Sequence, residues 1–178
     1  MTSIFLVTSA IYTSYGKCST EERIEQTKET IKSIETYAPG STIVLLDAGE
    51  KSVDIDFGVE LIDYTQKEII REPLNYYLSN NKDLEPDFII KSMLEIIMFE
   101  DYLRNHSLES YSRVFKLGGR YRLNSKFIGT SFKVPYVHDY VYFTIYKENW
   151  NFSTENTLDF IVNNIVNDIH YYEVSFKV

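Results

Sequence analysis

The apolar positions form runs and stripes that predict alternating strands and helices. Two continuous apolar runs, 4–7 and 42–46, have the length of strands. Between them Ile24, Ile31 and Ile34 recur at helical spacing. Strands without polar alternation are buried on both faces, as in parallel sheets that are covered by helices. The pattern therefore predicts a strand–helix–strand unit with two parallel strands.

The ends of this first helix carry signals of their own. Ser19 and Glu22 have the Ser-x-x-Glu spacing of a capping box, in which each residue's side chain bonds to the other's amide. Pro39 and Gly40 follow the last apolar position of the helix. Proline and glycine together favour a turn, so we expect the helix to end just before them.

The rest of the chain continues the alternation. Strand patterns cover 59–64, 113–117 and 140–146, with a short one at 173–178, and helical patterns cover 66–79, 86–105 and 156–169. Pro73 predicts a break near Glu72, because the residue before a proline is disfavoured in helical geometry. We expect one α/β domain over residues 1–178, with a mostly parallel central sheet flanked by helices.

Composition narrows the class of protein. The net charge of −8 argues against general nucleic-acid binding, which needs a basic face. No stretch approaches the roughly 18 consecutive apolar residues of a membrane span. The single cysteine, Cys18, excludes an internal disulfide and suits a reducing compartment. We therefore expect a cytoplasmic protein without a transmembrane segment.

Polar and small residues follow the first two strands where a ligand site is expected. In open parallel sheets, ligands bind outside the carboxyl ends of the strands. Here those ends carry Thr8, Ser9 and Ala10 after the first strand and Asp47 after the second. These four residues are the first candidates for a binding site.

A glycine pair and three cations lie at the end of the strand 113–117. Gly118 and Gly119 allow close approach of a ligand to the backbone, while Lys116, Arg120 and Arg122 concentrate positive charge in an acidic chain. Guanidinium groups bind phosphate in a bidentate manner. One interpretation is an anion site, and the other is a tight turn with solvated arginines.

Metal and thiol chemistry have little support in the sequence. The three histidines are far apart and show no zinc-ligand spacing. Asp54 and Asp56 form an Asp-x-Asp pair, but a solvated loop is the favoured interpretation over a metal site. Cys18 has no identifiable activating partner, so it is not predicted to be a nucleophile.

Two segments of the chain resemble a known family. One is the pattern after the first strand, formed by Ser19, Glu22, Arg23, Gln26, Thr27, Ile31, Ser33 and Ile34; the other is Phe-Lys-Leu-Gly-Gly-Arg-Tyr-Arg-Leu-Asn at 115–124. Together they resemble a group of bacterial and phage proteins that are similar to GT-A glycosyltransferases, the nucleotide-diphospho-sugar transferase fold. The resemblance covers roughly residues 3–146.

The resemblance implies a function and a set of roles. A sugar would move from a nucleotide-diphosphate donor to a hydroxyl of a glycan or another acceptor. The loop 8–10 would face the nucleotide, and Asp47 would approach the base or ribose. Lys91, on the long helix, and Arg120 would lie near the diphosphate, with Lys116 and the two glycines beside it. Asp139 would act as the base for the acceptor hydroxyl; the alternative for it is a polar loop residue.

The chain departs from this family at one motif. The family usually carries a metal-binding Asp-x-Asp near the end of the strand 113–117, where this sequence has Gly118, Gly119 and Arg120. Manganese or magnesium is therefore not the favoured partner of the diphosphate, and no other cofactor is predicted. Arginine and lysine would then neutralise the leaving group in place of a metal.

A non-catalytic alternative stays open at this point. The missing metal motif and the short length for this fold are also expected of a degenerate transferase domain that binds a nucleotide sugar, a glycan or a protein. The same length suits a domain without a full acceptor-binding part, or a piece of a larger protein.

Overall fold

The computed structural model describes most of the first 127 residues of the chain. The described residues are 3–13, 18–80, 87–108, 110–111, 113–125, 127 and 144–145. The predicted helix 156–169, the predicted strand 173–178 and Asp139 lie outside them, as does most of the predicted strand 140–146.

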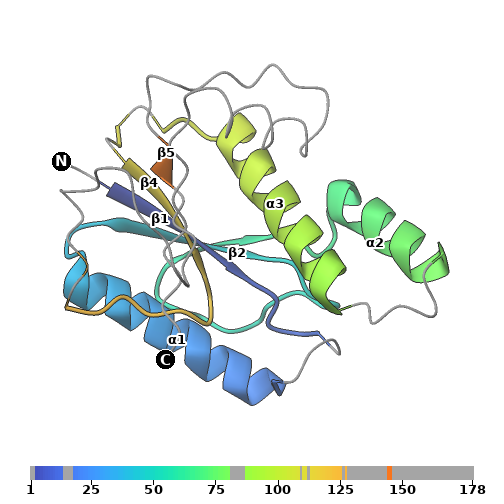
Figure 1. The fold of residues 1–178 in the computed structure, drawn as a ribbon, viewed down its shortest axis with the longest axis horizontal. Coiled ribbons are helices and arrows are strands. Elements are labelled where there is room, and N and C mark those ends of the chain that lie inside the picture. Colours follow the sequence, from blue (N-terminus) through green and yellow to red (C-terminus); the bar gives the residue numbers. More distant parts are fainter. Residues whose placement is uncertain are drawn as a thin grey trace.

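A five-stranded sheet forms the centre of the fold (Figure 1), with the strand order β3-β2-β1-β4-β5. The strands are β1 Ser3–Ser9, β2 Thr42–Asp47, β3 Glu60–Asp63, β4 Arg113–Gly118 and β5 Thr144–Ile145. The first four are parallel, and β5 pairs with β4 in the antiparallel direction. The prediction of an α/β fold whose first, second and fourth strands share one sheet is confirmed.

Helix α1, Thr20–Tyr37, begins and ends as the sequence predicts. The Glu22 amide donates to Ser19 Oγ at 3.2 Å, and the Ser19 amide donates to Glu22 Oε2 at 2.7 Å. This reciprocal pair is the expected capping box. At the other end, the Ala38 amide donates to the Ile34 carbonyl and Gly40 adopts a φ of 78°, which glycine accepts without strain.

The helices α2, Glu68–Asn80, and α3, Asp87–Asn105, follow one another before β4. The predicted break near Glu72 is wrong, because α2 continues through Pro73. A proline inside a helix removes one backbone hydrogen bond and costs about 3 kcal/mol. Ile70 and Leu74, on either side of Pro73, pack into the core, and this packing offsets the cost.

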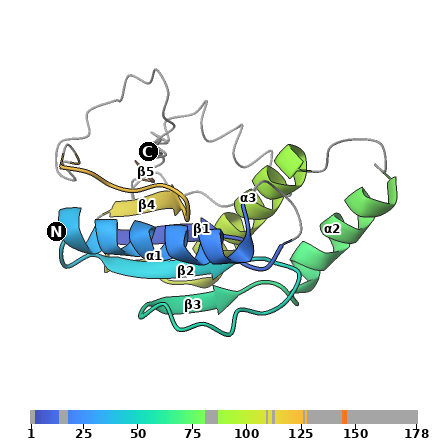
Figure 2. The same cartoon turned by 90° about the horizontal axis from the view of Figure 1, so that it is seen from below.

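Helices cover both faces of the sheet (Figures 1 and 2), so successive residues of each strand enter different cores. Ile4, Leu6 and Val44 belong to the core on the side of α3 and α2. Phe5 and Val7 belong to the core on the side of α1. This division explains the continuous apolar runs. The same alternation determines which face of the sheet each polar residue at a strand end points to.

The chain changes direction across β1. It passes from β1 through α1 to β2 and β3 on one side, and then through α2 and α3 to β4 on the other. The boundary between β1 and β4 is therefore a topological switch point, where open α/β sheets bind ligands. In the described part of the chain, no helix has both the length and the apolar character needed to cross a membrane.

Candidate functional site

The carboxyl edge of the sheet brings together residues from three neighbouring strands. Ser9 is in register with Asp47, and Thr8 is in register with Gly118. The Gly119 amide donates to the Thr8 carbonyl at 2.7 Å, which extends the pairing by one residue beyond β4. The residues that the sequence singled out after the first, second and fourth strands are thus neighbours at one edge.

Asp47 and Ser9 lie on the α1 side of this edge. Asp47 Oδ1 accepts hydrogen bonds from Ser9 Oγ at 2.6 Å and from the Ile11 amide at 2.9 Å. Asp47 is fully buried, and among the described residues no donor reaches its Oδ2. The carboxylate therefore braces the loop after β1, and a ligand would reach it directly only if that loop moved.

The environment of Asp47 favours its protonated form. Burial raises the pKa of this carboxyl above its ordinary value, and the nearby Asp63 carboxylate raises it further. The hydrogen bonds from Ser9 and Ile11 and the charge of Arg23 lower the pKa but do not cancel the effect of burial.

The loop after β1 is joined to the loop after β2. The Ala48 amide donates to the Ser9 carbonyl at 3.2 Å, and the Glu50 amide donates to the Tyr12 carbonyl at 2.6 Å. A Cβ on Gly49 would lie 2.6 Å from that same Tyr12 oxygen, so only glycine fits there without a shift. The two loops together cover Asp47.

Asp54 and Asp56 take part in this loop structure. Asp54 accepts a hydrogen bond from the Tyr12 hydroxyl, which lowers the pKa of the carboxyl, and pairs with Lys51 at 3.6 Å. Asp56 accepts from the Gly58 amide at 2.7 Å. Within the described ranges, no group of three acidic, histidine or cysteine residues is arranged to hold a metal ion. These contacts agree with the loop interpretation of the Asp-x-Asp pair.

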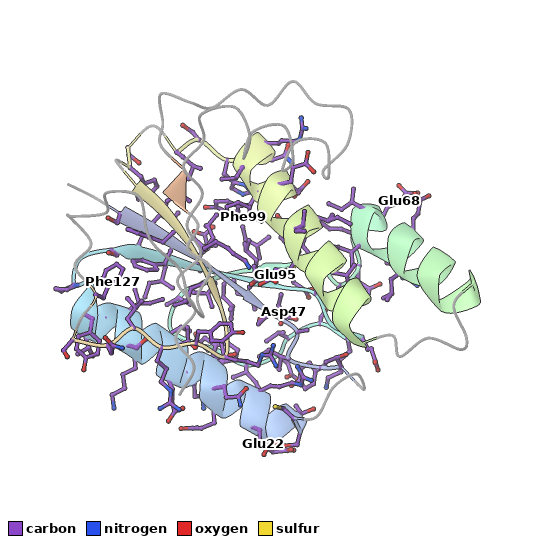
Figure 3. The ribbon with its side chains drawn as sticks, viewed as in Figure 1. Glu22, Asp47, Glu68, Glu95, Phe99 and Phe127 are labelled. Atoms are coloured by element: carbon purple, nitrogen blue, oxygen red, sulfur yellow. The ribbon has the colours of Figure 1, made fainter. Side chains whose placement is uncertain are left out.

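Thr8 points to the other face of the sheet, toward α3. Its hydroxyl donates to Glu95 Oε1, and Lys116 Nζ lies 2.7 Å from the same oxygen. Thr8 and Lys116 are buried, whereas the Glu95 side chain is 30% exposed. Figure 3 shows Glu95 on α3 and Asp47 at the end of β2. Glu95 and Asp47 thus lie on opposite faces of the carboxyl edge.

Gly118 and Gly119 are packed closely against their neighbours. A Cβ on Gly118 would meet the Tyr121 ring at 3.0 Å, and one on Gly119 would lie 3.1 Å from Thr27 Oγ1 and 3.2 Å from the Thr8 carbonyl oxygen. Further along, the Leu123 amide donates to Ser33 Oγ at 2.9 Å. The segment after β4 is therefore held between the end of β1 and the inner face of α1.

Within the described part of the chain, two of the three cations around the glycine pair form ion pairs with carboxylates. Lys116 pairs with Glu95, and Arg122 Nη2 lies 2.8 Å from Glu29 Oε2. Arg120 is exposed, and among the described residues no carboxylate pairs with it. The positive charge predicted from the sequence is therefore concentrated in Arg120.

For the remaining predicted residues, the structure describes no side-chain contact at the carboxyl edge. The Ala10 carbonyl accepts from Arg23 Nη1 at 3.4 Å, so Ala10 acts through its backbone. Lys91 belongs to α3, one turn before Glu95, and its side chain lies outside the described part. The position of Asp139 relative to the edge stays a prediction.

Sequence reasoning missed Glu95, Thr27 and Ser33 as parts of this edge. Glu95 is a single carboxylate within an otherwise apolar stretch of α3, and that break in the pattern was the available signal. Thr27 and Ser33 stand on the buried side of α1, where polar side chains need partners. Both find them in the segment after β4.

Comparisons of this chain with protein-family models, curated proteins and solved structures give no match.

Proposed function

We propose that this protein is a glycosyltransferase that binds a nucleotide-diphosphate sugar at the carboxyl edge between β1 and β4. One observation carries the proposal: the two segments that the sequence singled out, 8–10 and 118–120, meet at the switch point of a parallel sheet. Ligands of open α/β sheets bind at such points. The GT-A type is proposed from the resemblance of the sequence motifs.

The charges at the edge support an anionic donor held without a metal. Arg120 follows the close-packed Gly119 directly, and it is exposed without a carboxylate partner among the described residues. A guanidinium binds two oxygens of a phosphate at once and stabilises the charge that develops on a leaving diphosphate. A manganese or magnesium ion is not needed for this arrangement.

The proposed reaction is a displacement at the anomeric carbon of the donor sugar. The acceptor hydroxyl forms a bond to that carbon as the bond to the diphosphate oxygen breaks. The electron pair leaves with the nucleoside diphosphate, and the hydroxyl proton passes to a base. Asp139 remains the residue predicted from the sequence for that base.

A second candidate function is binding of the same ligand without catalysis. The sequence favours it, because Gly118, Gly119 and Arg120 stand where the family usually carries its metal-binding Asp-x-Asp motif. Arg120 is then the cation left to the diphosphate.

Both functions require a nucleotide site, and a thermal-shift panel tests whether the protein has one. The panel contains uridine, guanosine and thymidine diphosphates and their hexose esters, each with manganese or with a chelator. A ligand at one hundred times its Kd stabilises the fold by about 2.7 kcal/mol. A shift with one ligand supports the site, and release of its nucleoside diphosphate then distinguishes an enzyme from a binding protein. Equal melting temperatures with every ligand would contradict both functions.

A further inference from the structure

Glu95 is held in a fixed orientation at the carboxyl edge. Two donors share its Oε1: the Thr8 hydroxyl and Lys116 Nζ, the latter at 2.7 Å. The two donors come from neighbouring strands and are themselves buried, so they leave the carboxylate little freedom. Both of these contacts are made to Oε1, and the Glu95 side chain stays 30% exposed. One oxygen is anchored and the other is presented at the surface.

This arrangement selects against anions. Glu95 and Lys116 form an ion pair, and the more exposed member of that pair is the carboxylate. A phosphate at this position would meet a negatively charged oxygen and would lose its hydration without a new counter-charge. A hydroxyl, in contrast, donates a hydrogen bond to a carboxylate, and such charge-assisted bonds are stronger than neutral ones.

A metal ion is a poorer occupant of the same position. Divalent cations take several oxygen ligands. Within the described ranges, no group of acidic, histidine or cysteine residues suited to a metal includes Glu95. Lys116 also places a positive charge 2.7 Å from its Oε1. A neutral donor of hydrogen bonds is therefore the ligand class that fits.

We infer that Glu95 Oε2 binds a hydroxyl group of a saccharide, on the α3 side of the edge, while Arg120 receives the anionic part of the ligand. The inference rests on the proposed function for the identity of the whole ligand. It assigns the two parts of the ligand to different places at the carboxyl edge. The sugar lies against α3, and the diphosphate lies beyond the end of β4. Thr8 and Lys116 are positioning residues, because they act through Glu95.

The test compares the affinity of a nucleoside diphosphate with that of its hexose ester in four proteins. These are the wild type, Glu95→Gln, Glu95→Asp and the control Asp101→Asn. The control removes another ion pair of α3, Asp101 with Lys67 at 3.1 Å, about 9 Å further along the helix. Titration calorimetry gives the affinities, and urea unfolding first establishes that each variant is folded. Free hexoses are tested separately by saturation-transfer NMR.

The wild type and Asp101→Asn should bind the hexose ester more tightly than the diphosphate. Glu95→Gln and Glu95→Asp should lose about tenfold or more of affinity for the ester and lose no affinity for the diphosphate. An unchanged preference for the ester in both Glu95 variants would overturn the inference, as would an equal loss for both ligands. Absence of saccharide binding to the wild type, free or esterified, would overturn it too. Free hexoses that bind through Glu95 without any nucleotide binding would uphold it and refute the proposed function.

Discussion

The hydroxyl of Ser9 donates a 2.6 Å hydrogen bond to Oδ1 of Asp47, and this bond joins the ends of two neighbouring parallel strands. Because the Ile11 amide donates to the same oxygen, the loop after β1 folds back over the carboxylate. Asp47 is fully buried as a result. Its main effect in this structure is to shape the loop that a ligand would meet first.

Burial of Asp47 makes the stability of the fold depend on pH. Burial raises the pKa of Asp47 in the folded state above the ordinary value of 3.8. As the pH rises from 3.8 through the raised pKa, Asp47 stays protonated to a higher pH in the folded state than in the unfolded state. The free energy of unfolding therefore falls in this window, by at most about 1.4 kcal/mol per pH unit. The stability that protonated Asp47 contributes is lost above the raised pKa.

Asp47→Asn should remove this pH dependence. The amide keeps an oxygen for Ser9 and Ile11 but does not ionise, so the variant should gain stability relative to the wild type as the pH rises from about 4 toward 7. Urea unfolding of both proteins across that range measures the difference. A constant difference between wild type and Asp47→Asn would show that the pKa of Asp47 is not raised in the folded state.

Gly49→Ala should be more destabilising than Gly119→Ala. The new methyl group at position 49 would lie 2.6 Å from the Tyr12 carbonyl oxygen, which is backbone and already bonded to the Glu50 amide. At position 119 the nearest atoms lie at 3.1 Å or more. Overpacking of this kind costs about 1–3 kcal/mol, with Gly49→Ala expected at the upper end. Chemical denaturation of the two variants gives the order, and the reverse order would mean that the two loops separate easily.

The sheet and the first helix were predictable because their signals are local. The apolar runs 4–7 and 42–46 and the Ser19–Glu22 capping box each lie within a few residues. The switch point follows from the order of these elements, since a strand placed beside β1 after two further helices must lie on its free side.

The contacts within the edge were not predictable, because they join distant parts of the chain. Lys116 appeared to be a ligand-binding cation, yet Glu95, 21 residues earlier in the sequence, neutralises it. Asp47 appeared to be a contact residue, yet its burial depends on the loops around Tyr12 and Gly49. Local pattern indicates which residues reach the edge, and tertiary packing decides which of them a ligand can touch.

Pro73→Ala should stabilise the protein. Position 73 lies inside α2, where alanine restores an amide donor and proline costs about 3 kcal/mol relative to alanine. Proline also restricts the unfolded chain, which recovers roughly 0.4–1 kcal/mol of that cost. We therefore expect a net gain of about 2 kcal/mol in the free energy of unfolding in urea. Glu72→Ala, at the exposed neighbouring position, is the control and should change stability by a few tenths of a kcal/mol. A loss of stability in Pro73→Ala would indicate that the proline ring is needed for packing.

Among the described cations at the edge, Arg120 should contribute most to the binding of a diphosphate. It is exposed and without a carboxylate partner in the described part of the chain, whereas Arg122 pairs with Glu29 at 2.8 Å. Arg120→Ala should weaken binding of the preferred nucleotide sugar by about 1.5–3 kcal/mol, because one charge-assisted contact is lost. Arg122→Ala is the matched control and should change the affinity little. The double variant of Asp54 and Asp56 to Asn should also bind as the wild type does, since both carboxylates act within their own loop.

Titrations in manganese and in chelator complete this test. If positive side chains replace the metal at the end of β4, chelator should leave the wild-type affinity nearly unchanged, and the loss in Arg120→Ala should be the same in both buffers. Loss of binding in chelator would contradict the metal-free proposal. A larger loss for Arg122→Ala than for Arg120→Ala would place the anion on the α1 side of the segment after β4, since Glu29, the partner of Arg122, belongs to α1.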